Sequence, residues 1–125
     1  MLTSVVPILF VRDVATSAAW YGHLGFHIDF LHGSPTFYGA ISRDGVCLHL
    51  RHVHEPNFVE LAGREVSLIL ASIEVTDVAA LFDEVQRQRD VEIAQHLVHQ
   101  PWGGLDFQVR DPDGNTLSFV QYVPA

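Results

Sequence analysis

Several of the eight histidines are spaced so that two side chains could hold one metal ion. His52 and His54 would share a strand face if the strand before them extends that far. His96 and His99 lie three residues apart where a strand is predicted to end. A divalent ion needs three or four protein donors. Because eight histidines make chance pairs common, we predict stray ion binding at most and no functional metal at either pair.

The chain's single cysteine, Cys47, lies two residues before His49 on a predicted strand. Strand alternation puts both side chains on one face, where an imidazole could activate a thiolate. The two lie side by side along the strand, and no third group in the sequence is placed to orient them. We therefore prefer an idle, packed thiol. One cysteine also excludes an intrachain disulfide and a metal site with several cysteine ligands.

The stretch 100–122 is predicted to be a β-hairpin with a large aromatic ring at its mouth. Apolar residues at 105, 107 and 109 alternate with polar ones, as in a half-buried strand. Residues 111–115 read Asp-Pro-Asp-Gly-Asn, which is typical of a turn, and 116–122 favour a return strand. Trp102 stands before this hairpin between Pro101 and two glycines, an unusual place for a large aromatic unless something packs on it.

These residues require a set of strands and helices to position them. Asp13 is a good N-cap, Gly25 a C-terminal stop, and Thr76-Asp77 a cap for a second helix with an apolar face from Val78 to Val85. Pro7 cannot donate to a ladder, so the first strand is expected at an edge or sheet junction. The polar stretch 52–65 is expected to be a connecting loop. Helices are predicted at 15–24 and after residue 77, and strands at 5–11, 26–31, 37–42, 46–51, 66–75, 91–97, 105–110 and 116–122.

The order of these elements repeats a β-α-β-β-β unit. Val11-x-Asp13-Val14-Ala15 recurs as Val75-x-Asp77-Val78-Ala79, and an Asp-Gly turn precedes the last strand of each half. Each unit alone would leave one sheet face open, and pairing two units would bury it. We predict an α+β fold of two βαβββ modules forming a curved mixed sheet. Residues 1–125 are expected to be one domain, with module one at about 1–54, a linker at about 55–65 and module two at about 66–125.

Strand alternation predicts one mixed and one apolar sheet face. The apolar face would lie under the helices. The mixed face is where a ligand would bind, unless it is simply solvated. Its polar members are His49, Glu74, Asp106, Gln108 and Ser118.

The formal net charge is −8, and all seven fixed cations are arginine. An acidic chain repels phosphate, so nucleic acid is not an expected partner, whereas a cationic ligand would be attracted; solubility alone also explains such a charge. No apolar run reaches the length of a membrane span, and no secretory leader is evident. We expect a cytoplasmic protein with no membrane partner.

Several segments of the chain together form a recognisable signature. They are Leu2–Leu9, Val11–Val14, Trp20-Tyr21, Leu24-Gly25-Phe26, Gln100-Pro101-Trp102-Gly103, Asp106-Phe107 and Arg110–Asn115. With these segments the sequence resembles the vicinal-oxygen-chelate superfamily, which includes glyoxalase I, extradiol dioxygenases and fosfomycin- and bleomycin-resistance proteins. Within it the likeness is closest to the bleomycin-resistance proteins. The resemblance implies a strand-swapped homodimer, exchanged at Pro7, with two drug-binding grooves at the interface.

Enzymes of this superfamily hold a divalent metal at equivalent strand positions of the two modules. The internal repeat places these positions at Val6, His49, Leu70 and Ser118. Val and Leu donate nothing, and Ser is a poor ligand at neutral pH. We therefore expect no metal, no other cofactor and no catalytic residues.

The resemblance instead implies binding and sequestration of a bleomycin-type antibiotic without catalysis. Phe37 or Tyr38 and Trp102 would stack on a flat cationic drug, and Glu74 and Asp106 would attract its positive tail. The strand 71–74 lacks the tryptophans of well-known drug binders, and the loop 32–36 lacks acidic residues, so the ligand's identity is open. The alternatives are a metal-dependent lyase or dioxygenase and a binder of another small molecule. The expected ligand-binding residues are Phe37, Tyr38, His49, Glu74, Trp102, Gly103, Asp106 and Ser118.

Overall fold

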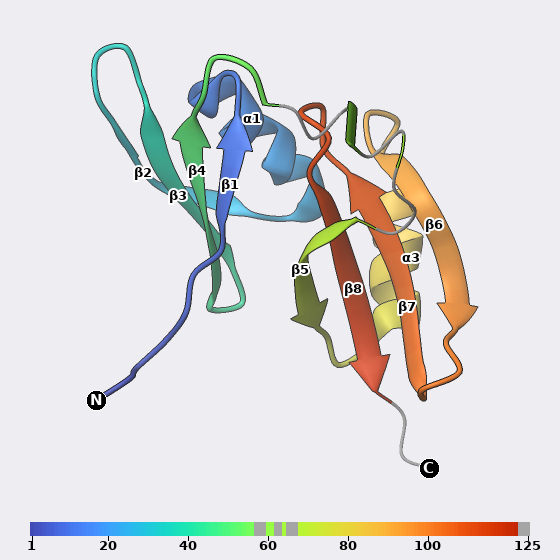
Figure 1. Ribbon diagram of the computed structural model, residues 1–125. Coiled ribbons are helices and arrows are strands. Elements are labelled where there is room, and N and C mark those ends of the chain that lie inside the picture. The colour runs from blue at the N-terminus through green and yellow to red at the C-terminus, as the bar shows by residue number, and fades with distance from the viewer. Residues whose placement is uncertain (57–59, 62–63, 65–67, 123–125) are drawn as a thin grey trace. The chain divides into compact units, whose positions relative to one another are not determined.

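The computed structural model describes residues 1–56, 60–61, 64 and 68–122, and the chain forms two compact units (Figure 1). Unit 1 is Met1–Asn57 and unit 2 is Phe58–Ala125. Each unit holds one four-stranded mixed sheet and one longer α-helix. The predicted α+β fold of two βαβββ modules is confirmed.

Unit 1 has the strand order β1-β4-β3-β2, with β1 parallel to β4 and the other pairs antiparallel. This confirms the edge position expected for the strand that follows Pro7. The elements are β1 (Ile8–Val11), α1 (Val14–Tyr21), a 3-10 turn η1 (Gly22–Leu24), β2 (His27–His32), β3 (Tyr38–Arg43) and β4 (Val46–His52).

Unit 2 repeats this arrangement with the order β5-β8-β7-β6. Here β5 is parallel to β8, while β8, β7 and β6 are antiparallel neighbours. The elements are β5 (Ile69–Glu74), α3 (Val78–Gln86), β6 (Glu92–His99), β7 (Gly104–Arg110) and β8 (Thr116–Tyr122).

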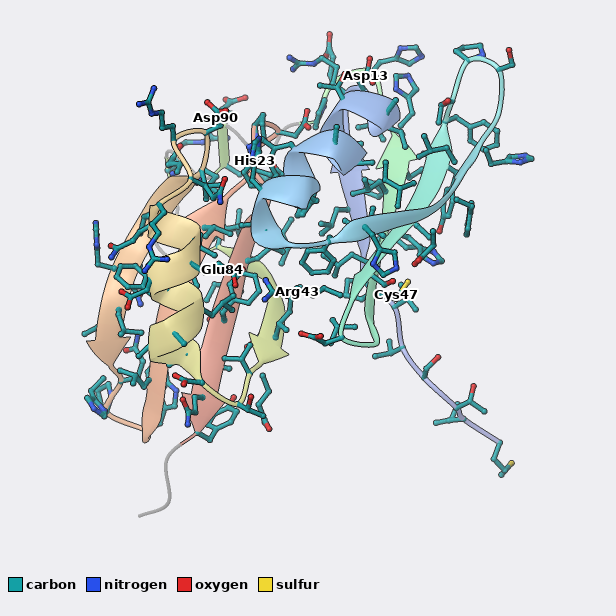
Figure 2. All side chains as sticks on the ribbon, turned by 180° about the vertical axis from the view of Figure 1, so that it is seen from behind. Asp13, His23, Arg43, Cys47, Glu84 and Asp90 are labelled. Carbon is teal, nitrogen blue, oxygen red and sulfur yellow. The ribbon has the colours of Figure 1, made fainter. Side chains whose placement is uncertain are left out.

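Local hydrogen bonds start and stop the helices as predicted. The Asp13 carboxylate, at the start of α1 (Figure 2), accepts from the Thr16 N–H at 2.9 Å. The Asp77 carboxylate accepts from the Ala80 N–H at 3.1 Å. Gly25 ends the first helical segment with φ of +81°, and Arg43 packs over it so closely that a Cβ there would clash. These caps explain why the same β-to-α transition occurs twice.

One helix covers one face of each sheet (Figures 1 and 2), and the core lies between them. In unit 2, Phe107 packs against Phe82 of α3 at 5.1 Å and stacks on Phe119 of β8 at 5.2 Å between ring centroids. Unit 1 buries Tyr21 of α1, Ile41 of β3 and Leu48 of β4 without exposed surface, and the Tyr21 ring meets Phe26 edge to face at 6.1 Å. Among α1, η1 and α3, none covers the opposite face of its sheet, which we call the open face.

Several predicted boundaries differ from those in the structure, and some lie outside the described residues. Residues 5–7 are not in β1, because Pro7 has no N–H for a ladder; its carbonyl instead accepts from the His49 N–H at 2.9 Å. In the predicted loop 52–65, residues 60, 61 and 64 are helical. Positions 57–59, 62–63 and 65–67 lie outside the described residues. Finally, β6 runs to His99 rather than 97.

The turn 111–115 is confirmed. Asp111 accepts from the Asp113 and Asn115 N–H groups at 2.9 and 2.8 Å, and Gly114 takes φ of +87°. This turn sets the register between β7 and β8 and thereby places Asp106, Gln108 and Ser118 on one face. None of the described helices is long and apolar enough to span a membrane.

Candidate functional site

The open face of the unit 1 sheet is apolar at its edges and polar at its centre. Ile8 and Phe10 of β1 are exposed there, whereas Leu9 and Val11 are buried toward the helix. Ile8 lies beside His49 and Ala40 lies opposite it, so these side chains share the open face. The predicted alternation in this strand is confirmed.

His49 and Tyr38 form the polar centre of this face. The Tyr38 hydroxyl hydrogen-bonds His49 Nδ1 at 2.8 Å, and the two rings meet edge to face at 5.3 Å. The exposed ring of Phe30 approaches His49 at 6.2 Å. One imidazole nitrogen is thus committed to a phenol, and both predicted residues belong to one aromatic cluster.

Phe37, the other predicted stacking residue, precedes β3 rather than lying in it. Its ring is exposed and meets His32 edge to face at 5.3 Å, while its N–H donates to the His32 carbonyl at 3.0 Å. Gly33 takes φ of +103°, and a Cβ there would meet the Phe37 ring at 2.5 Å. The loop geometry therefore holds an aromatic ring at the surface beside Tyr38.

A second polar cluster on unit 1 was not predicted. The Ser42 hydroxyl donates to the Asp29 carboxylate at 3.0 Å and bonds His27 Nε2 at 3.1 Å; His27 Nε2 also lies 3.0 Å from Asp29 Oδ1. Cys47 (labelled in Figure 2) lies opposite Ser42. Burial, and then the charge of Asp29, raise the pKa of the Cys47 thiol. The cysteine is thus held as a thiol, and the bond made by His49 goes to Tyr38.

The two histidine pairs have different surroundings. His52 and His54 pack edge to face at 5.0 Å, so the structure brings this pair together. However, His52 Nδ1 bonds the Arg12 carbonyl at 2.8 Å. His96 instead packs on Phe82 of α3 at 5.7 Å. Within the described ranges, no group of three or more His, Cys, Asp or Glu side chains is placed to hold a metal ion.

Trp102 lies in the tight connection between β6 and β7. The Gln100 N–H donates to the Gly104 carbonyl at 2.7 Å, and the Gly103 N–H donates to the Gln100 carbonyl at 3.0 Å. Gly103 takes φ of +100°, which explains the glycine at this predicted site position. The indole Nε1 would lie 3.4 Å from a Cβ at Gly104, and the side chain is 69% exposed. These hydrogen bonds fix the backbone of the turn, and the turn exposes the large indole ring to solvent.

Asp106, which was expected on the mixed face as a residue that attracts a cationic ligand, is buried, with only 5% of its surface exposed. Its Oδ1 accepts from Gln95 Nε2 at 2.7 Å and from Gln100 Nε2 at 3.0 Å. Gln95 Oε1 accepts from Gln108 Nε2 at 3.2 Å and from Gln100 Nε2 at 3.4 Å. We call Gln95, Gln100, Asp106 and Gln108 the amide network. It compensates the burial of the carboxylate.

The remaining predicted residues of unit 2 border this network. Ser118 is buried opposite Gln108 and beside Ser72. Glu74 is exposed at the end of β5, beside Val120, which lies opposite Asp106. Two rows therefore cross the open face, one with the carboxylates of Glu74 and Asp106 and one with hydroxyls and amides.

The four positions that correspond to the superfamily metal do not form a ligand set. Val6 and Leu70 offer no donor atom, and Ser118 is a poor ligand. His49 has one ring nitrogen committed to Tyr38. Three usable donors are missing, so the residues present do not fit this metal.

Sequence reasoning missed Gln95 and Gln100 as site residues. Register shifts interrupt β6 between Ile93 and Gln95 and between Gln95 and Val98, so simple alternation does not predict which face Gln95 occupies. Gln100 was noted only as part of the segment around Trp102. Without the register of β6 against β7, the sequence spacing of Gln95, Gln100 and Asp106 does not indicate that their side chains meet.

Fold and site together define a class: two βαβββ modules, each with one open sheet face that carries aromatic and polar side chains. A family model described as the Glyoxalase/Bleomycin resistance protein/Dioxygenase superfamily matches residues 3–119. The chain therefore belongs to the glyoxalase/bleomycin resistance protein/dioxygenase superfamily, which confirms the resemblance of the sequence.

Three solved structures show the likeness in detail. A bleomycin resistance determinant encoded on the transposon Tn5 is 22% identical over 98% of this chain and 100% of that one, with a TM-score of 0.76. A bleomycin-binding protein complexed with bleomycin is 23% identical over 98% and 100%, with a TM-score of 0.75. A bleomycin-binding protein from bleomycin-producing Streptomyces verticillus, complexed with copper(II)-bleomycin, is 29% identical over 95% of each chain, with a TM-score of 0.72. Comparison with curated proteins gave no match.

Proposed function

We propose that the protein binds and sequesters a cationic, flat glycopeptide antibiotic of the bleomycin type and breaks no bond in it. The observation that carries this proposal is Trp102, whose indole is 69% exposed on a turn with a pinned backbone. A ring held in this way loses little side-chain freedom when a planar heteroaromatic group stacks on it. The solved relatives that bind bleomycin support the choice of ligand.

Charge and aromatic surface in each unit support the same ligand class. Tyr38 and the exposed ring of Phe37 offer further stacking surface on unit 1. Glu74 is exposed at the open face of unit 2, and the net charge of −8 attracts cations at long range. A cytoplasmic location, which we include in the proposal, would let the protein intercept a drug before it reaches DNA.

A strand-swapped homodimer is part of this proposal. Residues 1–6 leave unit 1 as an extended segment (Figure 1), with Leu2 and Val5 almost fully exposed. Burial of each against a partner would contribute about 1.5–3 kcal/mol.

Replacing Leu2 and Val5 by Asp should yield a monomer by light scattering. The control, Thr3→Asp with Ser4→Asp, adds the same charge and should stay dimeric; a monomeric parent protein would refute the swap.

The chemistry of the donor set favours binding over catalysis, since Val6 and Leu70 replace ligands that an enzyme of this superfamily would need. The competing function is a metal-dependent lyase or dioxygenase. Metal analysis of protein purified without a histidine tag separates the two. One divalent ion per chain, lost in His49→Ala, would overturn the proposal.

The direct test is titration of the full chain with metal-free and copper-loaded bleomycin. Saturable quenching of tryptophan fluorescence at micromolar drug is expected. At a drug concentration of 100 Kd the native state gains about 2.7 kcal/mol, which raises Tm by on the order of 10 °C. If neither drug form quenches fluorescence or raises Tm, the proposed function is refuted.

A further inference from the structure

The hydrogen bonds of the amide network all run in a fixed donor-to-acceptor direction. The proposed function makes no use of this property. A carboxylate accepts hydrogen bonds and donates none. Because Gln95 and Gln100 both point at Asp106 Oδ1, at 2.7 and 3.0 Å, the end of each amide that faces it must be the NH2 group. The carboxylate thus decides which way both amides are turned.

The orientation of the Gln95 amide in turn determines that of the Gln108 amide. With its NH2 group turned to Asp106, Gln95 directs Oε1 toward Gln108, which must then donate, and it does so at 3.2 Å. Gln100 Nε2 also reaches Gln95 Oε1 at 3.4 Å. Within the described part of the chain, no hydrogen bond is made to Gln100 Oε1, Gln108 Oε1 or Asp106 Oδ2. What the network has left to offer is therefore these three acceptors and the second N–H of Gln108 Nε2.

The network lies directly beside the exposed indole. Gln100 is half-buried and begins the turn that carries Trp102. Gly104, which lies under the indole, and Asp106 are two residues apart on β7 and share a face, so they are separated by roughly 7 Å. A ring on Trp102 and a substituent extending a few ångströms along β7 would therefore meet both surfaces.

We propose that the amide network, with three acceptors and one N–H left over, is a recognition patch for an amidinium- or guanidinium-like group, a planar cation with several N–H donors, attached to the aromatic ring that Trp102 binds. Asp106 is the positioning residue, since it fixes the orientation of Gln100 and, through Gln95, that of Gln108, so that Oε1 of both remains available. A cation without N–H groups would leave these acceptors unpaired. The inference rests on the proposed function for the place of the site and adds the chemistry that selects the ligand.

The probe pair that tests it is benzamidinium and its N,N,N′,N′-tetramethyl derivative, which share charge and ring but differ in N–H donors. Each is titrated into the full chain, with the side-chain NH2 signals of the three glutamines and the Trp102 indole signal followed by NMR. Benzamidinium should bind about tenfold more tightly and shift the network and indole signals together. Equal affinities, or shifts confined to other residues, would overturn the proposal.

Variants separate orientation from charge. Asp106→Asn removes one charge and allows the amides to turn over, so the preference for benzamidinium should fall toward unity. The matched control is Glu92→Gln, which removes the same charge at the other end of the β6–β7 pair, where Glu92 meets Arg110 at 2.6 Å, and should keep the preference. If Asp106→Asn does not fold, Gln100→Leu serves instead: it should lower only benzamidinium affinity. A preference that survives in the folded variants refutes the assignment.

The same preparation is titrated with bleomycin, so that the two proposals fail separately. A wild-type protein that prefers benzamidinium but does not bind bleomycin refutes the proposed drug and retains the patch. One that binds bleomycin and shows no preference between the probes refutes the patch alone.

Discussion

Replacing Trp102 with alanine should weaken ligand binding strongly while leaving the fold almost unchanged. The side chain is 69% exposed, so about 170 Å² of an indole's roughly 250 Å² is available, and a planar ligand on one face covers about half of it. At about 25 cal/mol per Å² this contributes about 2 kcal/mol, and stacking adds about 1 kcal/mol. The expected rise in Kd for bleomycin is therefore on the order of 100-fold.

The stability of the Trp102→Ala protein should change by no more than about 0.5 kcal/mol, because little of the ring is buried. Binding is measured by calorimetry, so that it does not depend on the fluorophore that was removed, and stability by urea unfolding. The control is Trp20→Phe, which alters the buried tryptophan of α1 that meets Tyr21 edge to face at 4.9 Å. It should lower stability and keep the parent Kd. A Trp102→Ala protein that folds normally and binds within about threefold of the parent would refute the stacking role.

Three further predictions concern unit 1. Tyr38→Phe removes the hydroxyl bonded to His49 and should cost about 1 kcal/mol in urea unfolding; no measurable loss would mean that the bond contributes nothing in solution. Asp29→Asn should lower the pKa of Cys47 and speed its alkylation by iodoacetamide near pH 8, whereas an unchanged rate would leave burial as the sole cause. The pKa of Asp13 is lowered by hydrogen bonds from Thr16, so its stabilisation is complete above the ordinary carboxyl pKa, about pH 4, and is lost as pH falls through the lowered value. Asp13→Asn should remove that part of the acid-induced loss, and identical acid unfolding of both proteins would contradict it.

The elements themselves followed from local residues. Asp13 and Asp77 were identified as caps because an aspartate before an apolar helix face is a local signal, and both caps are present. The turn 111–115 was predictable for the same reason, since its bonds join residues two and four apart. These signals, repeated in both halves, were enough to predict two βαβββ modules, whereas the family was recognised from the resemblance of longer segments.

The arrangement of the candidate site depended on contacts that no local pattern contains. Tyr38 and His49 meet because β3 and β4 pair in one register, and a shift of one residue would send them to opposite faces. His27, Asp29 and Ser42 meet across a bulge in β2. Even the residues that the sequence singled out acquired their bonding partners only from strand pairing.

The sequence by itself determined which residue types would lie on the open faces, and it singled out Trp102 from the glycines and proline around it. Only the tertiary structure decided that Asp106 is buried and accepts hydrogen bonds from Gln95 and Gln100 rather than lying solvated on the open face. The physical reason is that burial and hydrogen-bond direction depend on what lies across the strand pair. Register shifts in β6 set those neighbours, and the sequence of β6 alone does not.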